Sequence, residues 1–145
     1  MRRIIPAGVM LAAAGYAAWV YIPRSESSGH PYVIDGDTLV INSKSFRLAG
    51  IDAEELSEPN GHRARRYLAR LIGGYVVTCK VTGERSHNRY VARCRLPSGL
   101  DIGGAMVRSG HALDCERYSG GAYSPHEPPG IRKILISKPY CRRLP

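Results

Sequence analysis

The sequence lacks the Cys-x-x-Cys spacing that is typical of structural zinc sites. It is also short of acidic residues, because 12 aspartates and glutamates stand against 21 lysines and arginines, which gives a formal net charge of +9. The first absence argues against a zinc protein. The shortage of acidic residues favours a polyanionic partner, although a basic surface can also serve only to keep a small protein soluble.

The four cysteines are far apart in the sequence, at Cys79, Cys94, Cys115 and Cys141. Because they are even in number, they can pair completely in an oxidising compartment, and four cysteines allow three pairings. We expect Cys79 to pair with Cys94, because a turn near residues 83–85 brings their two segments together as a hairpin. Cys115 would then pair with Cys141 and hold the C-terminal tail to the domain. Four buried thiols in a cytosolic protein are the alternative.

No charged residue occurs from Ile4 to Ile22, whereas arginines stand on both sides of this run. At ~1.5 Å per residue, such a run nearly spans the ~30 Å hydrocarbon core of a membrane. The pattern predicts an export signal over residues 1–24, either cleaved or kept as a membrane anchor through residues 4–22. We therefore expect a periplasmic, extracellular or membrane-anchored protein, with a polar linker at residues 25–30.

The rest of the chain alternates short apolar segments with turn residues. Five segments are predicted to be strands: residues 31–34, 38–41, 45–51, 75–81 and 90–96. Two segments are predicted to be short helices: residues 62–72 and 103–109. This order predicts an α+β, mainly β domain over residues 31–118, with a five-stranded OB-type barrel and two short helices. Prolines and glycines predict an irregular tail over residues 119–145.

Acids and arginines are spaced along three of these predicted strands and the residues beside them, at Asp37, Arg47, Asp52, Glu55 and Arg89. Carboxylates can hold a hard cation, arginines can grip a phosphate, and a further carboxylate can activate water. Each residue alone has an ordinary interpretation as a hairpin corner or a solvated strand face. Their combination indicates a phosphodiesterase site.

The order and spacing of five motifs resemble the staphylococcal nuclease-like (thermonuclease) family. The similarity runs from about Tyr32 to Tyr118 and covers residues 35–38, 47–55, 61–71, 89–92 and 101–112. The resemblance implies an OB-type barrel with helices packed against it, and cleavage of DNA and RNA with calcium.

The resemblance also implies a metal site. By motif position, Asp37 and Asp52 supply carboxylates to Ca²⁺, and Ala53 supplies its backbone carbonyl where the family often has threonine. Calcium takes six to eight oxygen ligands, so water and a substrate phosphate would complete the shell. Asp35 would support either the turn or the surroundings of the metal ligands.

The same resemblance implies roles in catalysis and substrate binding. Glu55 would activate or position the attacking water, and Arg47 and Arg89 would clamp the scissile phosphate. Tyr118 lies near the family's base-stacking tyrosines. His87 stands where the family has an aromatic-rich context, and we expect it to contact substrate.

The sequence therefore predicts an exported calcium-dependent phosphodiesterase that hydrolyses single-stranded DNA and RNA with low sequence preference. A catalytically impaired OB-type nucleic-acid-binding module tethered at the membrane is the alternative, and a membrane-tethered adaptor domain is the third hypothesis. Glu55 beside two metal-type acids favours the enzyme, because a protein that only binds has no need of it. No protein partner is implied.

Overall fold

The computed structural model describes residues 26–143, and the predicted export signal lies outside them. The strands in this part of the chain are β1 (Glu26–Gly29), β2 (Tyr32–Val33), β3 (Thr38–Ile41), β4 (Lys44–Leu48), β5 (Ile51–Asp52), β6 (Val77–Ser86), β7 (Arg89–Arg95) and β8 (Leu113–Asp114). The helices are α2 (Gly61–Leu71), α3 (Ile102–Arg108) and α4 (Glu116–Ser119), followed by the 3₁₀ turns η1 (Ser124–His126), η2 (Ile131–Lys133) and η3 (Pro139–Cys141). No helix of residues 26–143 combines the length and the apolarity needed to cross a bilayer.

The main sheet has six strands in the order β1-β6-β7-β4-β3-β2. Strands β2, β3 and β4 form the predicted antiparallel meander, and β4 then pairs with β7 in parallel. Among the described residues, the edge strands β1 and β2 do not pair with each other, so the prediction of a closed five-stranded barrel is wrong. The fold is nevertheless α+β and mainly β, as predicted.

Two local features account for the difference from the predicted barrel. Residues 26–29, which we expected in a linker, form β1 because the edge of β6 offers them an antiparallel partner. The predicted strand over residues 45–51 is divided at Gly50, whose φ of 74° is readily adopted only by glycine. The bend turns β5 away from the main sheet, and β5 pairs instead with β8.

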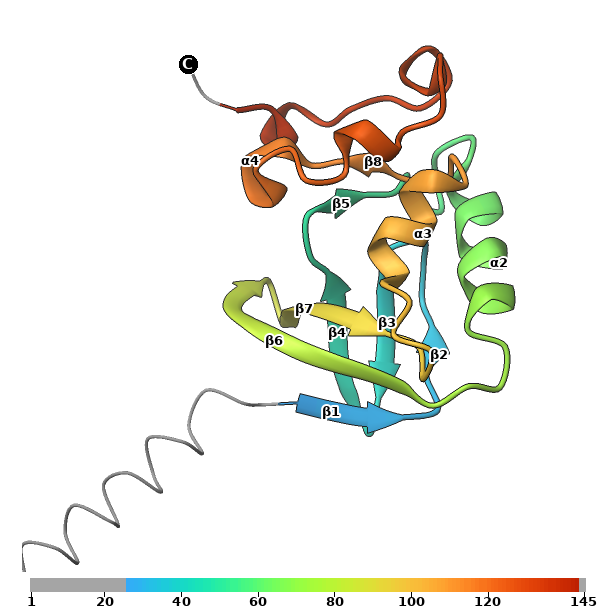
Figure 1. Cartoon of the computed structure of the whole chain (residues 1–145), viewed down its shortest axis with the longest axis vertical. Coiled ribbons are helices and arrows are strands. Elements are labelled where there is room, and N and C mark those ends of the chain that lie inside the picture. The colour runs from blue at the N-terminus through green and yellow to red at the C-terminus, as the bar shows by residue number, and fades with distance from the viewer. Residues whose placement is uncertain (1–25, 144–145) are drawn as a thin grey trace, which may run out of the picture.

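Helices α2 and α3 lie side by side and cover one side of the sheet (Figure 1). Helix α2 buries Ala64 and Leu68, which follow the predicted apolar spacing, while three of its four arginines are exposed and Arg65 is half-buried. Helix α3 is shorter and buries nearly all its side chains. Helix α4 has a single turn. It is the third α-helix of residues 26–143, whereas the sequence predicts two helices.

The C-terminal segment packs over β5 and β8, at the end of the molecule away from β1 (Figure 1). Leu113, Ile131 and Leu135 form a small second core there. The buried Asp114 carboxylate organises the segment, since Ser124 Oγ donates to its Oδ2 at 2.7 Å and Tyr123 N donates to its Oδ1 at 3.2 Å. The tail therefore has a fixed course although it contains no long helix.

Both predicted disulfides are present. Cys79 in β6 and Cys94 in β7 lie directly opposite each other in the sheet register and are bonded. Cys115, which follows β8, is bonded to Cys141 in η3 across a sequence separation of 26 residues. The second bond fixes the end of the tail beside β5 and β8.

Candidate active site

The turn before β3 places Asp37 in the interior. Asp37 N donates to Asp35 Oδ1 at 3.0 Å, which closes the turn. Gly36 is pressed against the loop after β5 and against α2, because an added Cβ would lie 2.7 Å from Ala53 Cβ and 2.6 Å from Ala64 Cβ. Only glycine allows this approach, so the Asp-Gly-Asp sequence fixes where the Asp37 carboxylate lies.

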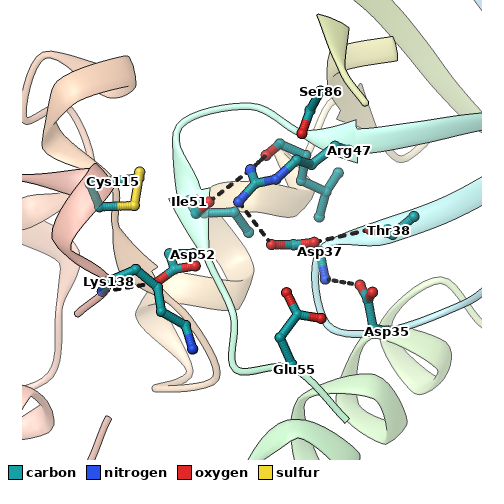
Figure 2. A network of polar contacts seen from close by, with 12 residues as sticks. Asp35, Asp37, Thr38, Arg47, Ile51, Asp52, Glu55, Ser86, Cys115 and Lys138 are labelled. Carbon is teal, nitrogen blue, oxygen red and sulfur yellow. Dashed lines mark hydrogen bonds and ion pairs between the residues drawn. A yellow bond between two sulfur atoms is a disulfide. The ribbon is translucent and has the colours of Figure 1, made fainter. Parts of the chain in front are cut away.

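Asp37 is the centre of a charged network (Figure 2). Arg47 Nη2 lies 3.1 Å from Asp37 Oδ2, and Thr38 Oγ1 donates to Asp37 Oδ1 at 3.0 Å. Arg89 Nη1 donates to Thr38 Oγ1 at 2.7 Å and lies 3.8 Å from Asp37 Oδ1. The two arginines thus approach one carboxylate from neighbouring strands, because β4 pairs with β7.

Burial dominates the electrostatics of Asp37. The residue is only 6% exposed, and this desolvation raises the pKa of Asp37 to about 6. The ion pair with Arg47 opposes the rise without cancelling it. A carboxylate in this position gains from any further positive charge that reaches it.

Arg47 also holds the bend between β4 and β5. Its Nη1 donates to the carbonyl oxygens of Leu48 and Ile51, at 3.2 and 3.1 Å. One guanidinium therefore joins Asp37 to the backbone that leads into Asp52.

Asp52, in β5, is bound by the C-terminal tail. Tyr140 OH donates to Asp52 Oδ1 at 3.0 Å, and Lys138 N donates to Asp52 Oδ2 at 3.4 Å. Burial raises the pKa of Asp52, and the Tyr140 hydrogen bond acts in the opposite direction. Sequence reasoning missed Tyr140 and Lys138, and the only signal was their closeness to Cys141.

The neighbouring acids Glu54 and Glu55 have different surroundings. Glu54 is buried, and Asn60 N donates to its Oε2 at 2.7 Å. Glu55 is exposed, and within residues 26–143 its carboxylate has no hydrogen-bond partner. In the view of Figure 2 its side chain points toward Asp37. Glu54 thus braces the loop, and Glu55 is open to solvent and ligand.

Helix α2 fixes the backbone of Glu55. Gly61, the first residue of the helix, lies against it so closely that an added Cβ would be 1.8 Å from the Glu55 carbonyl oxygen. Glu55 N in turn donates to Glu58 Oε2 at 2.7 Å. The loop that carries Glu55 is therefore held from both sides.

A cleft of about 490 Å³ opens beside this network. Its walls are formed by the β4–β5 bend, the β6–β7 hairpin, Tyr118 in α4, and Tyr140 in the tail. The lining includes Arg47, Glu55, Arg85, His87, Arg89, Arg93, Tyr118 and Tyr140. Four of these side chains are arginines, so the cleft suits a polyanion.

The structure thus gathers five of the predicted site residues in one cleft: Arg47, Glu55, His87, Arg89 and Tyr118. Asp37, Asp52 and Ala53 are buried and are not part of the lining. His87, at the tip of the β6–β7 hairpin, has a φ of 54°. Tyr118 is 52% exposed, and the Arg117 guanidinium lies over its ring, 5.6 Å from the centroid.

The residues predicted to hold calcium supply donors of the right kind. Two buried carboxylates and a backbone carbonyl are hard oxygen ligands, and each carboxylate oxygen keeps a lone pair beyond its present contact. Within residues 26–143 no three His, Cys, Asp or Glu side chains gather as a complete metal site. Asp37, Asp52 and Ala53 therefore offer the oxygen donors that calcium prefers, and further ligands would have to come from water or phosphate.

Three known proteins are similar in sequence to more than half of this chain. An uncharacterized endonuclease of Escherichia coli is 31% identical over 91 residues, which are 60% of each chain. A probable staphylococcal-like nuclease of Oryza sativa subsp. japonica is 33% identical over 94 residues, 64% of this chain and 25% of the rice protein. A succinoglycan biosynthesis protein of Rhizobium meliloti (strain 1021) is 27% identical over 107 residues, 66% of this chain and 56% of that protein.

The chain spans less than two thirds of the length of each of these relatives. The sequence profile of the family described as "Staphylococcal nuclease homologue" matches residues 45–127. This match covers more than half of the chain and includes Arg47, Asp52, Glu55 and Arg89. The chain belongs to the staphylococcal nuclease homologue family.

Proposed function

We propose that this protein is a calcium-dependent nuclease that hydrolyses phosphodiester bonds in single-stranded DNA and RNA with low sequence preference. The observation that carries the proposal is the meeting of Arg47, Arg89 and the unpaired Glu55 carboxylate in one basic cleft, beside the buried Asp37. Family membership and the nuclease names of two relatives support it.

The two arginines bind the scissile phosphate. Both have planar guanidinium groups that can donate two parallel hydrogen bonds to phosphate oxygens. Their contacts with Asp37 and Thr38 hold them in place before substrate arrives. A preorganised donor of this kind also stabilises the charge that grows on the phosphoryl oxygens in the transition state.

Glu55 accepts a proton from the attacking water. The water oxygen forms a bond to phosphorus and its proton passes to the Glu55 carboxylate. The bond from phosphorus to the leaving oxygen breaks, and that oxygen keeps the electron pair and takes up a proton from solvent water to become a hydroxyl. Asp37, Asp52 and the Ala53 carbonyl would hold calcium, which would neutralise phosphate charge and act as a Lewis acid. Asp37 also keeps Arg47 directed at the phosphate.

Tyr118 and His87 provide a surface on which bases can stack. Stacking is tolerant of base identity, and phosphate contacts do not read sequence, so the two together predict low sequence preference. Bases in a duplex are already stacked on one another, which favours single-stranded substrates.

We also propose that residues 1–24 direct export across the cytoplasmic membrane. Two disulfides support this, because such bonds persist mainly in oxidising compartments. A fusion of residues 1–30 to a reporter that is active only after export tests the proposal, and a reporter that stays cytoplasmic contradicts it.

The decisive experiment compares cleavage of single-stranded DNA and RNA with calcium and with a chelator. We expect cleavage with calcium, none with chelator, and loss of turnover in Glu55→Gln. Glu26→Gln, on exposed β1, is the matched control and should cleave like the parent. Equal cleavage with and without chelator would refute the calcium mechanism. Tight binding without cleavage by the parent would favour the nucleic-acid-binding module.

A further inference from the structure

The last turn of the tail touches both acid-bearing segments of the site. Tyr140 OH and Lys138 N each donate to a different oxygen of Asp52, which fixes the rotation of that carboxylate. The Lys138 side chain forms an ion pair with Glu58. Glu58 in turn accepts the hydrogen bond from Glu55 N at 2.7 Å. One short segment therefore restrains Asp52 and the loop of Glu55 together.

The Cys115–Cys141 disulfide holds this segment in place. Cys141 is the direct neighbour of Tyr140, and Cys115 N donates to the Gly50 carbonyl at 2.9 Å, at the start of the bend that leads into β5. The bond thus connects the backbone beside Asp52 to the backbone beside Tyr140. This matters because Tyr140 is 45% exposed and packing alone restrains it weakly.

We propose that Tyr140 and Lys138 are positioning residues that set the geometry of Asp52 and of the Glu55 loop, and that the Cys115–Cys141 bond keeps them there. The proposal rests on the proposed function, because it concerns the same site. This role differs from simple stabilisation of the fold, because Tyr140 contacts a candidate metal ligand and belongs to neither core cluster. Removal of a partner that orients a metal ligand typically costs about 10–100-fold in metal affinity or activity.

Tyr140→Phe tests the positioning role with little change in packing, because only the hydroxyl is lost. Calorimetry of the metal-free, oxidised protein should give a calcium affinity about 10-fold weaker than that of the parent. Turnover should fall by a similar factor at limiting calcium and recover in excess calcium, while KM for DNA stays near the parent value. Tyr75→Phe is the control, because Tyr75 is exposed and lies outside the cleft, and it should leave calcium affinity unchanged.

The double variant Cys115→Ala/Cys141→Ala tests the disulfide. It should weaken calcium binding at least as much as Tyr140→Phe, whereas Cys79→Ala/Cys94→Ala should retain the parent affinity. Thermal unfolding of each variant shows whether the domain remains folded at the assay temperature.

The outcomes separate the two proposals. A parent that binds calcium and cleaves, together with a Tyr140→Phe protein of parent affinity and turnover, would overturn the positioning role alone. A loss in Tyr140→Phe that excess calcium does not rescue, with calcium affinity intact, would also overturn it. A parent that neither binds calcium nor cleaves would remove the proposed function and, with it, this inference.

Discussion

Asp37 makes the stability of the metal-free protein depend on pH in a defined direction. Burial raises its pKa from the ordinary 3.8 to about 6 in the folded protein. A carboxyl whose pKa is higher in the folded protein than in the unfolded chain contributes to the free energy of unfolding. That contribution is complete below the unfolded pKa, near 4, and it is lost as pH rises through the folded pKa of about 6. The difference between the two values corresponds to about 3 kcal/mol, because each pH unit is worth about 1.4 kcal/mol.

The assay is chemical denaturation in chelator at pH 4 and at pH 8, for the parent and for Asp37→Asn. The asparagine cannot ionise, so its protein lacks this contribution at both pH values. The stability of the parent relative to Asp37→Asn should therefore fall by about 2.5 kcal/mol between pH 4 and pH 8, because a small part of the total is already lost at pH 4. Glu26→Gln controls for the loss of an exposed carboxylate and should follow the parent at both pH values.

Calcium should change this comparison, because it binds the ionised carboxylate. Saturating calcium should stabilise the parent at pH 8 by RT ln(1 + [Ca²⁺]/Kd) and leave Asp37→Asn nearly unaffected. Below pH 6 calcium affinity should fall up to about tenfold for each pH unit, since binding must displace the proton. Parallel pH profiles of the parent and Asp37→Asn in chelator would refute the reasoning about burial.

Three further predictions concern the cleft. Glu55→Gln should lower kcat about 10²–10⁴-fold while DNA binding, measured by anisotropy, survives; full activity would require a different base. Arg89→Lys keeps the charge but loses the planar fork, so kcat/KM for DNA should fall about 10-fold or more, and an unchanged value would remove the bidentate contact. Gly61→Ala should clash with the Glu55 carbonyl and destabilise the protein by about 1–3 kcal/mol in denaturant titration, with lower kcat at temperatures where it stays folded. Wild-type stability in Gly61→Ala would show that the loop of Glu55 can shift at little cost in free energy.

Local sequence patterns were sufficient to predict the elements that depend on near neighbours. The apolar spacing of α2 and the hairpin that joins Cys79 to Cys94 are of this kind. The pairing of Thr38 with Arg47 also follows from a tight meander, which brings an acid-bearing turn beside an arginine-bearing strand. The β6–β7 hairpin and β4 together supply most of the residues that line the cleft.

The remaining features depend on contacts that a local pattern does not contain. Residues 26–29 are polar and form a strand only because β6 offers them an edge. The bend at Gly50 divides a continuous apolar segment because β8, distant in sequence, pairs with β5. The Tyr140–Asp52 hydrogen bond spans 88 residues, and no periodicity in a tail rich in proline and glycine indicates it.

The two kinds of feature meet at Asp52. The motif predicts that an aspartate follows the arginine-bearing strand. The chain leaves the main sheet before it reaches that aspartate, which lies in β5 of the second sheet. Four contacts then restrain the segment: the Arg47 guanidinium on the Ile51 carbonyl, the pairing with β8, and the two tail donors on the carboxylate. Asp37 is held differently, by its own turn, by the packing of Gly36 against Ala64 of α2, and by Arg47 and Arg89 on the carboxylate. The tail donors reach Asp52, so the Cys115–Cys141 disulfide lies on the Asp52 side of the site.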